Sequence, residues 1–210
     1  MSSHVFSLTC IDCESTLQGL NGDMTFTCSS CSLAYSITEK SLQKYPMVLR
    51  APEDAKTKDG LWLPFWELQC NPEIVAEHPD RLNDYELPSQ IDVFVKGFSL
   101  TNVSKIGNPG LFLTQKGADP CQPTPTPQPS VVGARRPVDV AKAYAELFLL
   151  ELLDRQADIE GISITLNISR IRFAGIFFED HGDVLKCPAT NRTYPAGLVD
   201  DIVAIRDARS

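Results

Sequence analysis

The sequence contains no long apolar run: no stretch of 18 or more uncharged apolar residues occurs among its 210 residues. A transmembrane helix needs about 20 such residues, so we expect no membrane span. The N-terminal sequence MSSHVFSLTC has neither the basic segment nor the apolar segment of a secretory signal peptide. These absences favour a cytoplasmic protein.

Basic residues are in the minority, with 19 Lys and Arg against 27 Asp and Glu, which gives a formal net charge of -8. A phosphate backbone attracts basic surfaces, so nucleic acid is not the expected partner. The basic clusters are Arg135–Arg136 and the pair Arg170 and Arg172. We interpret both as a charged face in contact with solvent.

Signatures of catalysis are also missing. The three histidines, His4, His78 and His181, are scattered and do not have the spacing of metal ligands. The sequence has no G-x-S-x-G nucleophile turn, no P-loop and no G-x-G-x-x-G opening a helix. We therefore do not expect an enzyme, and we assign no catalytic residue.

Four cysteines with metal-ligand spacing are the clearest chemical feature that is present. Cys10, Cys13, Cys28 and Cys31 form two CxxC pairs separated by 14 residues. Each CxxC places two sulfurs on one tight turn, and two such turns supply four thiolates at about 2.3 Å from a zinc ion. A four-thiolate site leaves no open coordination position for a substrate. We predict one structural Zn²⁺ ion.

The other three cysteines, Cys70, Cys121 and Cys187, lie far apart, and the odd total of seven favours reduced thiols over disulfides. Rubredoxin-type iron uses the same four thiolates but typically with CxxCG, whereas Glu14 and Ser32 follow the pairs here. Since glycine relieves backbone crowding at such turns, we prefer zinc. An iron electron carrier and a nucleic-acid-binding zinc ribbon are the alternatives.

Residues 1–50 have few large apolar side chains, so we predict a zinc ribbon that depends on its metal. Structural zinc contributes roughly 10–16 kcal/mol in small fingers, which replaces a missing core. Between the two CxxC pairs, the turn-forming residues Gly19–Asp23 are flanked by Leu17 and by the alternating Met24–Thr27. This pattern predicts two strands joined by a turn.

Residues 51–116 are predicted to form a small antiparallel β region. The apolar residues 61–68 predict a buried strand, and Pro64 must lie at an edge or a bulge because it cannot donate a hydrogen bond. Two further strands are expected at Ile91–Val95 and Leu111–Leu113, with the turn sequence GNPG between them.

Residues 117–137 contain six prolines and almost no large apolar side chains. This composition predicts an extended, polyproline-like linker that is exposed to solvent. We expect no role for Cys121 within it.

Residues 138–210 are predicted to form a helix plus a β unit. Apolar residues recur at three and four positions from Val138 to Arg155, which predicts a helix whose apolar surface is wider than one stripe. Strict alternation over Ile162–Ile168 predicts a strand. The alternation changes phase before Ile171, which predicts a β-bulge near Ser169–Arg170.

A second knuckle-like sequence lies near the C-terminus. Cys187–Ala196 repeats the layout of Cys28–Ile37, and the tyrosines Tyr35 and Tyr194 each lie seven residues after the first cysteine. Thr190 takes the place of the second cysteine, and a hydroxyl is a poor substitute for a thiolate ligand. We interpret this segment as a degenerate, metal-free knuckle, with chance similarity as the alternative.

The ribbon resembles a known family over about a quarter of the chain. The matching residues are Cys10, Cys13, Cys28, Cys31, Leu33, Ala34, Tyr35 and Ile37. They resemble the small zinc-ribbon activator subunit of tRNA and rRNA methyltransferases and its short bacterial relatives, with Ser36 where that family usually has proline. The resemblance implies a partner-binding adaptor and no active site. It does not identify a methyltransferase as the partner.

Five residues are candidates for the partner-binding surface: Leu33, Tyr35, Trp62, Phe65 and Trp66. For the three in the aromatic group, core packing is the favoured interpretation, and a partner-binding surface is the alternative. The fold class expected from the whole sequence is α+β, mostly β, in which the β-containing parts can pack as one body. The expected function is that of a non-catalytic, zinc-stabilised adaptor or accessory subunit for another protein of unknown identity.

Overall fold

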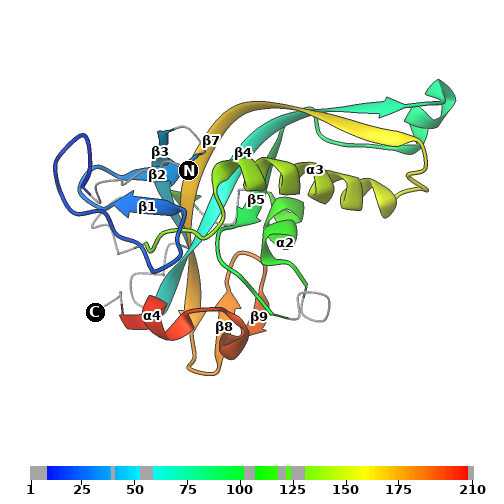
Figure 1. Ribbon diagram of the computed structural model, residues 1–210. Helices are drawn as coiled ribbons and strands as arrows, with labels where there is room; N and C mark the ends of the chain where they lie inside the picture. The colour runs from blue at the N-terminus through cyan, green and yellow to red at the C-terminus, as the bar shows by residue number, and fades with distance from the viewer. Residues whose placement is uncertain are drawn as a thin grey trace.

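Two long strands, β4 and β7, run side by side through the molecule and connect all its parts (Figure 1). The computed structural model describes residues 9–38, 41–52, 59–101, 107–117, 122–123 and 131–207. The elements in chain order are β1 (Thr25–Cys28), β2 (Leu33–Ile37), β3 (Leu42–Ala51), β4 (Gly60–Ala76), the 3-10 helix η2 (Pro79–Asp84), β5 (Ile91–Lys96), α2 (Pro109–Lys116), β6 (Gln122–Pro123), α3 (Val138–Asp154), β7 (Ile162–Asp180), β8 (Val184–Cys187), β9 (Arg192–Pro195), η3 (Ala196–Leu198) and α4 (Ile202–Asp207).

All the described strands, from β1 near the N-terminus to β9 near the C-terminus, belong to one sheet. Its order is β1-β2-β3-β7-β4-β5, with β8 and β9 beside the end of β7 and β6 beside β3. The predicted mostly β character and the α3 helix are confirmed. Because β3 and β7 are parallel, the sheet is mixed. The strands predicted for residues 51–116 therefore do not form a separate antiparallel unit, since β4 pairs along its whole length with β7.

The predicted β-bulge is confirmed. Gln69 pairs with Arg170 and Cys70 with Ile168, so Ser169 is the extra residue in β7. The Ser169 hydroxyl donates to the Gln69 carbonyl oxygen at 3.2 Å. A bulge adds one residue to one strand only, which is why the apolar alternation changes phase at this point in the sequence.

Pro64 of β4 has a neighbouring strand on one side only. β7 pairs with it, whereas β5 on the other side ends one residue before it. The partner of Pro64 in β7 is Gly175, and pairing with β5 begins only at Phe65. The Pro64 carbonyl oxygen accepts from the Gly97 N–H at 2.8 Å, beyond the end of β5. The N–H that proline lacks would point to this same side, where the ladder ends. The predicted edge position is therefore correct only for the side facing β5.

The strand predicted at Leu111–Leu113 is wrong, because these residues belong to helix α2. The Asn108 side chain accepts from the Gly110 N–H at 3.0 Å, and Pro109 occupies the first helical position. Asparagine as N-cap followed by proline is a favoured helix start. The same residue types favour turns, so the local sequence fits both structures.

The two faces of the sheet carry two hydrophobic cores. Side chains alternate along a strand, so Phe65 and Trp66 lie on opposite faces, and both are fully buried. Trp66 packs with Phe173 under helix α3, with ring centroids 5.2 Å apart. Phe65 stacks on Phe178 on the other face, at 6.3 Å. The interpretation of the aromatic group as core is confirmed for Phe65 and Trp66.

The end of the predicted linker is buried, and the prediction of an exposed segment is wrong there. Val131 and Ala134 are each 1% exposed. Ala134 exchanges backbone hydrogen bonds with Thr25 of β1, at 2.9 and 3.0 Å. The short apolar sequence VVGA thus lies beside β1, with Val131 in one hydrophobic core and Val132 in the other. Residues 118–121 and 124–130, and with them Cys121, lie outside the described residues.

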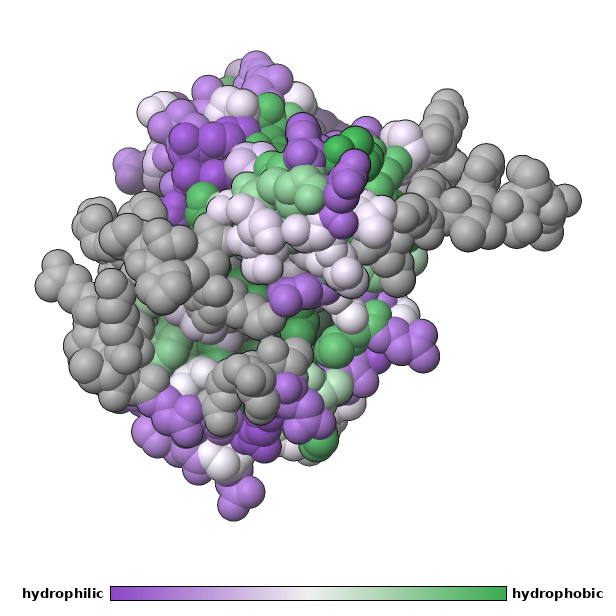
Figure 2. Space-filling model, turned by 90° about the vertical axis from the view of Figure 1, so that its left-hand side faces the viewer, coloured by the Kyte–Doolittle hydropathy of each residue, from purple (hydrophilic) through white to green (hydrophobic). Residues whose placement is uncertain are grey.

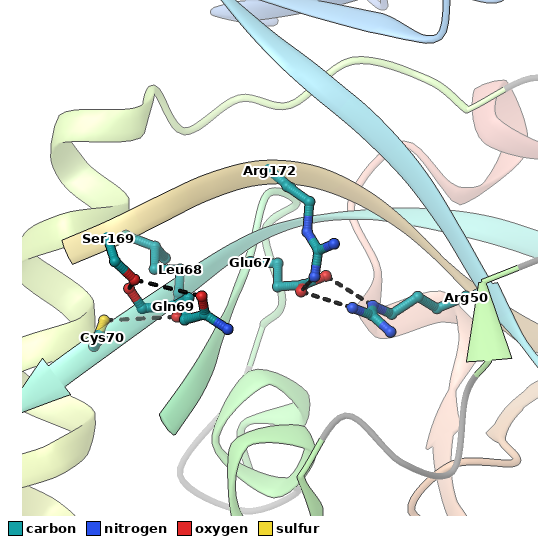
Figure 3. A network of polar contacts seen from close by, with 7 residues as sticks. All are labelled: Arg50, Glu67, Leu68, Gln69, Cys70, Ser169 and Arg172. Atoms are coloured by element: carbon teal, nitrogen blue, oxygen red, sulfur yellow. Dashed lines mark hydrogen bonds and ion pairs between the residues drawn. The ribbon is translucent and has the colours of Figure 1, made fainter. Parts of the chain in front are cut away.

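A buried ion network crosses the sheet between β3, β4 and β7 (Figure 3). Glu67 of β4 is 1% exposed and accepts from the Arg50 Nε and Nη2 atoms, both at 2.7 Å. Arg172 of β7 donates to the same carboxylate. The interpretation of Arg172 as a solvated charge is therefore wrong, since the cross-strand partner Glu67 draws its side chain into the core.

Removing Glu67 tests this network. Glu67→Ala leaves two guanidinium groups in the core without their shared carboxylate, and such a loss lowers the free energy of unfolding by about 3–5 kcal/mol. Urea denaturation measures the change. Glu151→Ala is the matched control, because it removes an exposed pair with Arg155 at 2.7 Å and costs at most about 0.5 kcal/mol. Equal losses for the two variants would contradict a structural role for the network.

Asp23 gives the fold a pH dependence. It is 8% exposed, its Oδ2 accepts from the Leu20 N–H at 2.6 Å, and burial raises its pKa to about 6. The unfolded value is about 3.9, so the folded chain binds this proton more tightly and loses stability as the pH rises from about 4 to 6.

Asp23→Asn removes the buried charge. The variant should be more stable than the wild type above pH 6, by about 1–2 kcal/mol after allowance for partial solvation, and equally stable near pH 4. Urea denaturation at several pH values measures the difference. A gain that is the same at pH 4 and pH 7 would show that the charge of Asp23 is not its cause.

Candidate metal centre

The four cysteines lie on two tight turns that face each other. Cys10 and Cys13 occupy a turn that is closed by a β-bridge between Thr9 and Thr16. Cys28 ends β1, and Cys31 lies in the turn that leads into β2. Antiparallel pairing of β1 with β2 closes this second turn. The predicted strand before β1 is reduced to one bridge, between Gln18 and Thr27.

The sulfur positions fit one tetrahedral ion. The Sγ atoms of Cys10 and Cys31 are 3.9 Å apart, and those of Cys13 and Cys28 are 3.5 Å apart. All four ligand atoms lie within 4.8 Å of one another. Metal–sulfur bonds of about 2.3 Å place the sulfurs of a tetrahedral site about 3.8 Å apart. The four cysteines can therefore hold a metal ion.

The backbone after each CxxC is left-handed. Glu14 has φ 61° and Ser32 has φ 57°, a conformation that favours glycine. The two turns thus have the geometry that glycine would provide, although the sequence has none there. The absence of glycine at these two positions therefore does not favour zinc over iron.

A chain of polar contacts connects one ligand to solvent. The Tyr35 hydroxyl lies 3.1 Å from Cys10 Sγ and donates to Asp12 Oδ2 at 2.6 Å. The Asp12 carboxylate also accepts from Lys44 Nζ at 2.9 Å. Tyr35 itself is 1% exposed. Partners of this kind orient a metal ligand and adjust its basicity. Our sequence analysis missed Asp12 and Lys44, although Asp12 lies inside the first CxxC.

Without a metal, the thiols of the two turns differ in acidity. Burial raises the pKa of Cys10, but the contact with the Tyr35 hydroxyl and the backbone hydrogen bonds at Asp12 and Cys13 together outweigh burial, so the pKa is lowered overall. Hydrogen bonds from Ser15 lower the pKa of Cys13 to about 6. The hydrogen bond with Cys13, together with burial, raises the pKa of Cys31 to about 12, and burial raises that of Cys28. The thiols of the first turn therefore lose their protons to a bound cation more readily than those of the second turn.

Three of the five candidate partner-binding residues are buried, and the structure contradicts their placement on a surface. Tyr35 is 1% exposed, and Phe65 and Trp66 are fully buried. Strand alternation points Tyr35 toward the first CxxC turn, where its hydroxyl meets Cys10. Leu33 and Trp62 are half-buried, and Trp62 packs against Phe177 with ring centroids 5.5 Å apart.

The similarity between the two knuckle-like sequences extends to the backbone. Cys187 pairs with the residue five positions later, as Cys28 does. The residue before that partner has positive φ in both hairpins, 54° at Asn191 and 57° at Ser32. The Thr190 hydroxyl is buried without a hydrogen-bond partner among the described residues. The description of this hairpin as a metal-free knuckle stays an interpretation.

The comparisons add no relative. Protein-family models, curated proteins and solved structures were compared with the chain, and none matched. The resemblance of the ribbon to the methyltransferase activator subunits therefore stays a prediction based on its matching residues. None of the six cysteines in the described part of the chain forms a disulfide. Within that part, no helix has the length and apolar character needed to cross a membrane.

Loss of the Tyr35 hydroxyl should weaken metal binding. Tyr35→Phe removes the contact with Cys10 Sγ, and the loss of such a ligand partner lowers metal affinity roughly tenfold or more. Competition with a chromophoric chelator measures the affinity. Tyr45→Phe is the control, since it removes an exposed hydroxyl bonded to Gln43. Equal affinities for the two variants would mean that the Tyr35 contact has no effect on the site.

Proposed function

We propose that the chain is a non-catalytic, zinc-stabilised adaptor or accessory subunit that binds another protein in the cytoplasm. The observation that carries this proposal is the convergence of four cysteine sulfurs within 4.8 Å. An ion held by four protein ligands has no position left for a substrate or a reactive water. Its chemical contribution is then to fix the positions of the two turns.

Zinc is the proposed ion because it favours four-thiolate tetrahedral sites and supplies no redox chemistry. Nucleic acid is not the proposed partner, because three of the four arginines of the two basic clusters contact groups within the chain, and Arg170 alone is too little for a basic face. Arg135 pairs with Asp201, and Arg136 lies 4.8 Å from the ring centre of Tyr144. Arg172 pairs with Glu67. Arginine side chains held by these partners are less available to bind phosphate groups.

The proposed partner contact is centred on Ile11, at the tip of the first CxxC turn. Its side chain is 73% exposed although it lies between two metal ligands. On the side of the molecule that carries the ribbon, apolar side chains are visible as small patches among hydrophilic ones (Figure 2). A rigid apolar side chain loses little conformational freedom on binding, which favours a protein contact. Ile11 thus replaces the buried aromatic residues as the candidate contact.

Affinity purification at native abundance tests the adaptor role. The wild-type chain should retain a stoichiometric partner protein, and Ile11→Glu should lose it while metal content and thermal stability stay unchanged. Val203→Glu is the matched control, since Val203 is 66% exposed on α4 and should keep the partner. A wild-type chain that is recovered alone and shows a turnover activity would contradict the proposal.

A further inference from the structure

Among the residues that the structure describes, the edge of β7 that faces away from β4 has no partner strand over more than half its length. Beyond the bulge, β4 and β7 continue alongside helix α3 as a two-stranded arm, residues 70–76 and 162–168, whose Ile164, Leu166 and Ile168 pack against the core that includes α3 (Figure 1). On the side away from β4, β7 pairs with β3 only at residues 173–176 and with β8 only at 179–180. No strand in the described part of the chain pairs with residues 162–172 on that side.

The pairing of Pro72 indicates which backbone groups point outward. Pro72 is opposite Leu166 in the β4–β7 ladder. Because proline has no N–H to donate, this pair belongs to the set that makes no hydrogen bonds between the two strands. The N–H and C=O groups of Leu166 then point away from β4. Alternation gives the same orientation to Ile162, Ile164 and Ile168.

This edge lacks the features by which proteins prevent strand association. Lysine, proline and inward-pointing charges are the common protective devices. The sequence from Gly161 to Ser169, GISITLNIS, contains no charge and no proline. The bulge at Ser169 lies only at its end. An unprotected row of backbone groups on an otherwise acidic chain indicates that a strand normally covers it.

The sequence of the edge is complementary to itself. A two-fold axis perpendicular to the sheet relates two copies without moving any side chain to the opposite face of the joined sheet. Even-numbered residues of one copy then pair with even-numbered residues of the other copy. With the axis at Thr165, Ile162 lies opposite Ile168 and Ile164 opposite Leu166. The four apolar side chains, which are half-buried in one copy, then meet only apolar side chains.

The remaining pairs in this register are also matched. Ser163 lies opposite Asn167, so exposed polar side chains meet on the other face. At the ends of the paired segment, Glu160 of one copy comes to the same end as Arg170 of the other copy. Opposite charges at both ends favour this register over a shifted one.

We propose that the protein forms a two-fold symmetric dimer in which residues 162–168 of two copies pair as antiparallel strands. The joined sheet contains β4 and β7 of each copy, and both α3 helices lie on the same face. Such pairing covers the open edge of both copies at once and so closes the assembly at two chains. The inference goes beyond the adaptor proposal and does not rest on the metal.

Light scattering after size exclusion, with sedimentation velocity over a range of concentrations, tests the dimer. The wild type should have the mass of two chains. Thr165→Lys and Thr165→Asp each place two like charges against each other at the axis, so each should weaken association about tenfold. An equimolar mixture of the two variants should recover the dimer, because opposite charges then meet at the axis.

Asn71→Lys is the control. It adds the same charge to an exposed position of the arm, on β4, one strand away from the proposed interface, and should leave the dimer intact. A wild type that stays at the mass of one chain at every concentration would overturn the proposal. So would an equal loss for Thr165→Lys and Asn71→Lys, or a mixture of the Thr165 variants that stays monomeric while circular dichroism shows both to be folded.

Discussion

The N-terminal part of this structure depends on four sulfur atoms. The apolar cluster of the ribbon has four buried members, and two of them, Cys10 and Cys28, are themselves candidate ligands. A cluster this small supplies little hydrophobic stabilisation, and in the proposed account a metal ion bound by the four cysteines holds the two turns together. Thr25 of β1 in turn exchanges backbone hydrogen bonds with Ala134, and the Thr27 hydroxyl donates to the Val131 carbonyl oxygen, in the segment that leads into α3. The position of the helix start therefore depends on the ribbon.

The sheet connects the ribbon to the rest of the chain. β3 continues from the ribbon hairpin into the parallel pairing with β7, and Arg50 near its end joins the buried network on Glu67. A buried carboxylate shared by two arginines requires β3, β4 and β7 to be in register. The metal site, the ion network and the two hydrophobic cores are thus parts of one body. Such a body is a rigid support for the exposed turn at Ile11 and for the open edge of the arm.

Local patterns predicted the features that depend on local sequence. The CxxC spacing predicted that the four thiols meet, and the phase change before Ile171 predicted the bulge at Ser169. Asn108–Pro109 was misinterpreted because the same residues favour a turn and a helix start. In each case the information lay in the sequence of the element itself or, for the thiols, in two short motifs of known spacing.

Features that join distant segments could not be predicted in this way. Whether the valines near residue 131 are buried depends on β1, more than 100 residues earlier in the chain. Tyr35 was assigned to a surface because the sequence does not show that its face of β2 meets Cys10. The network on Glu67 likewise requires three strands whose neighbours in space are not neighbours in sequence.

The most direct test of this account is metal analysis of the purified chain, combined with hydrogen exchange before and after chelation. The account predicts a colourless protein with one zinc ion per chain. Chelation should remove exchange protection from β1, β2 and residues 131–134, while the centre of the β4–β7 ladder keeps its protection. A chain without bound metal, a visible thiolate-to-iron absorption band, or a ribbon that stays protected after chelation would contradict it.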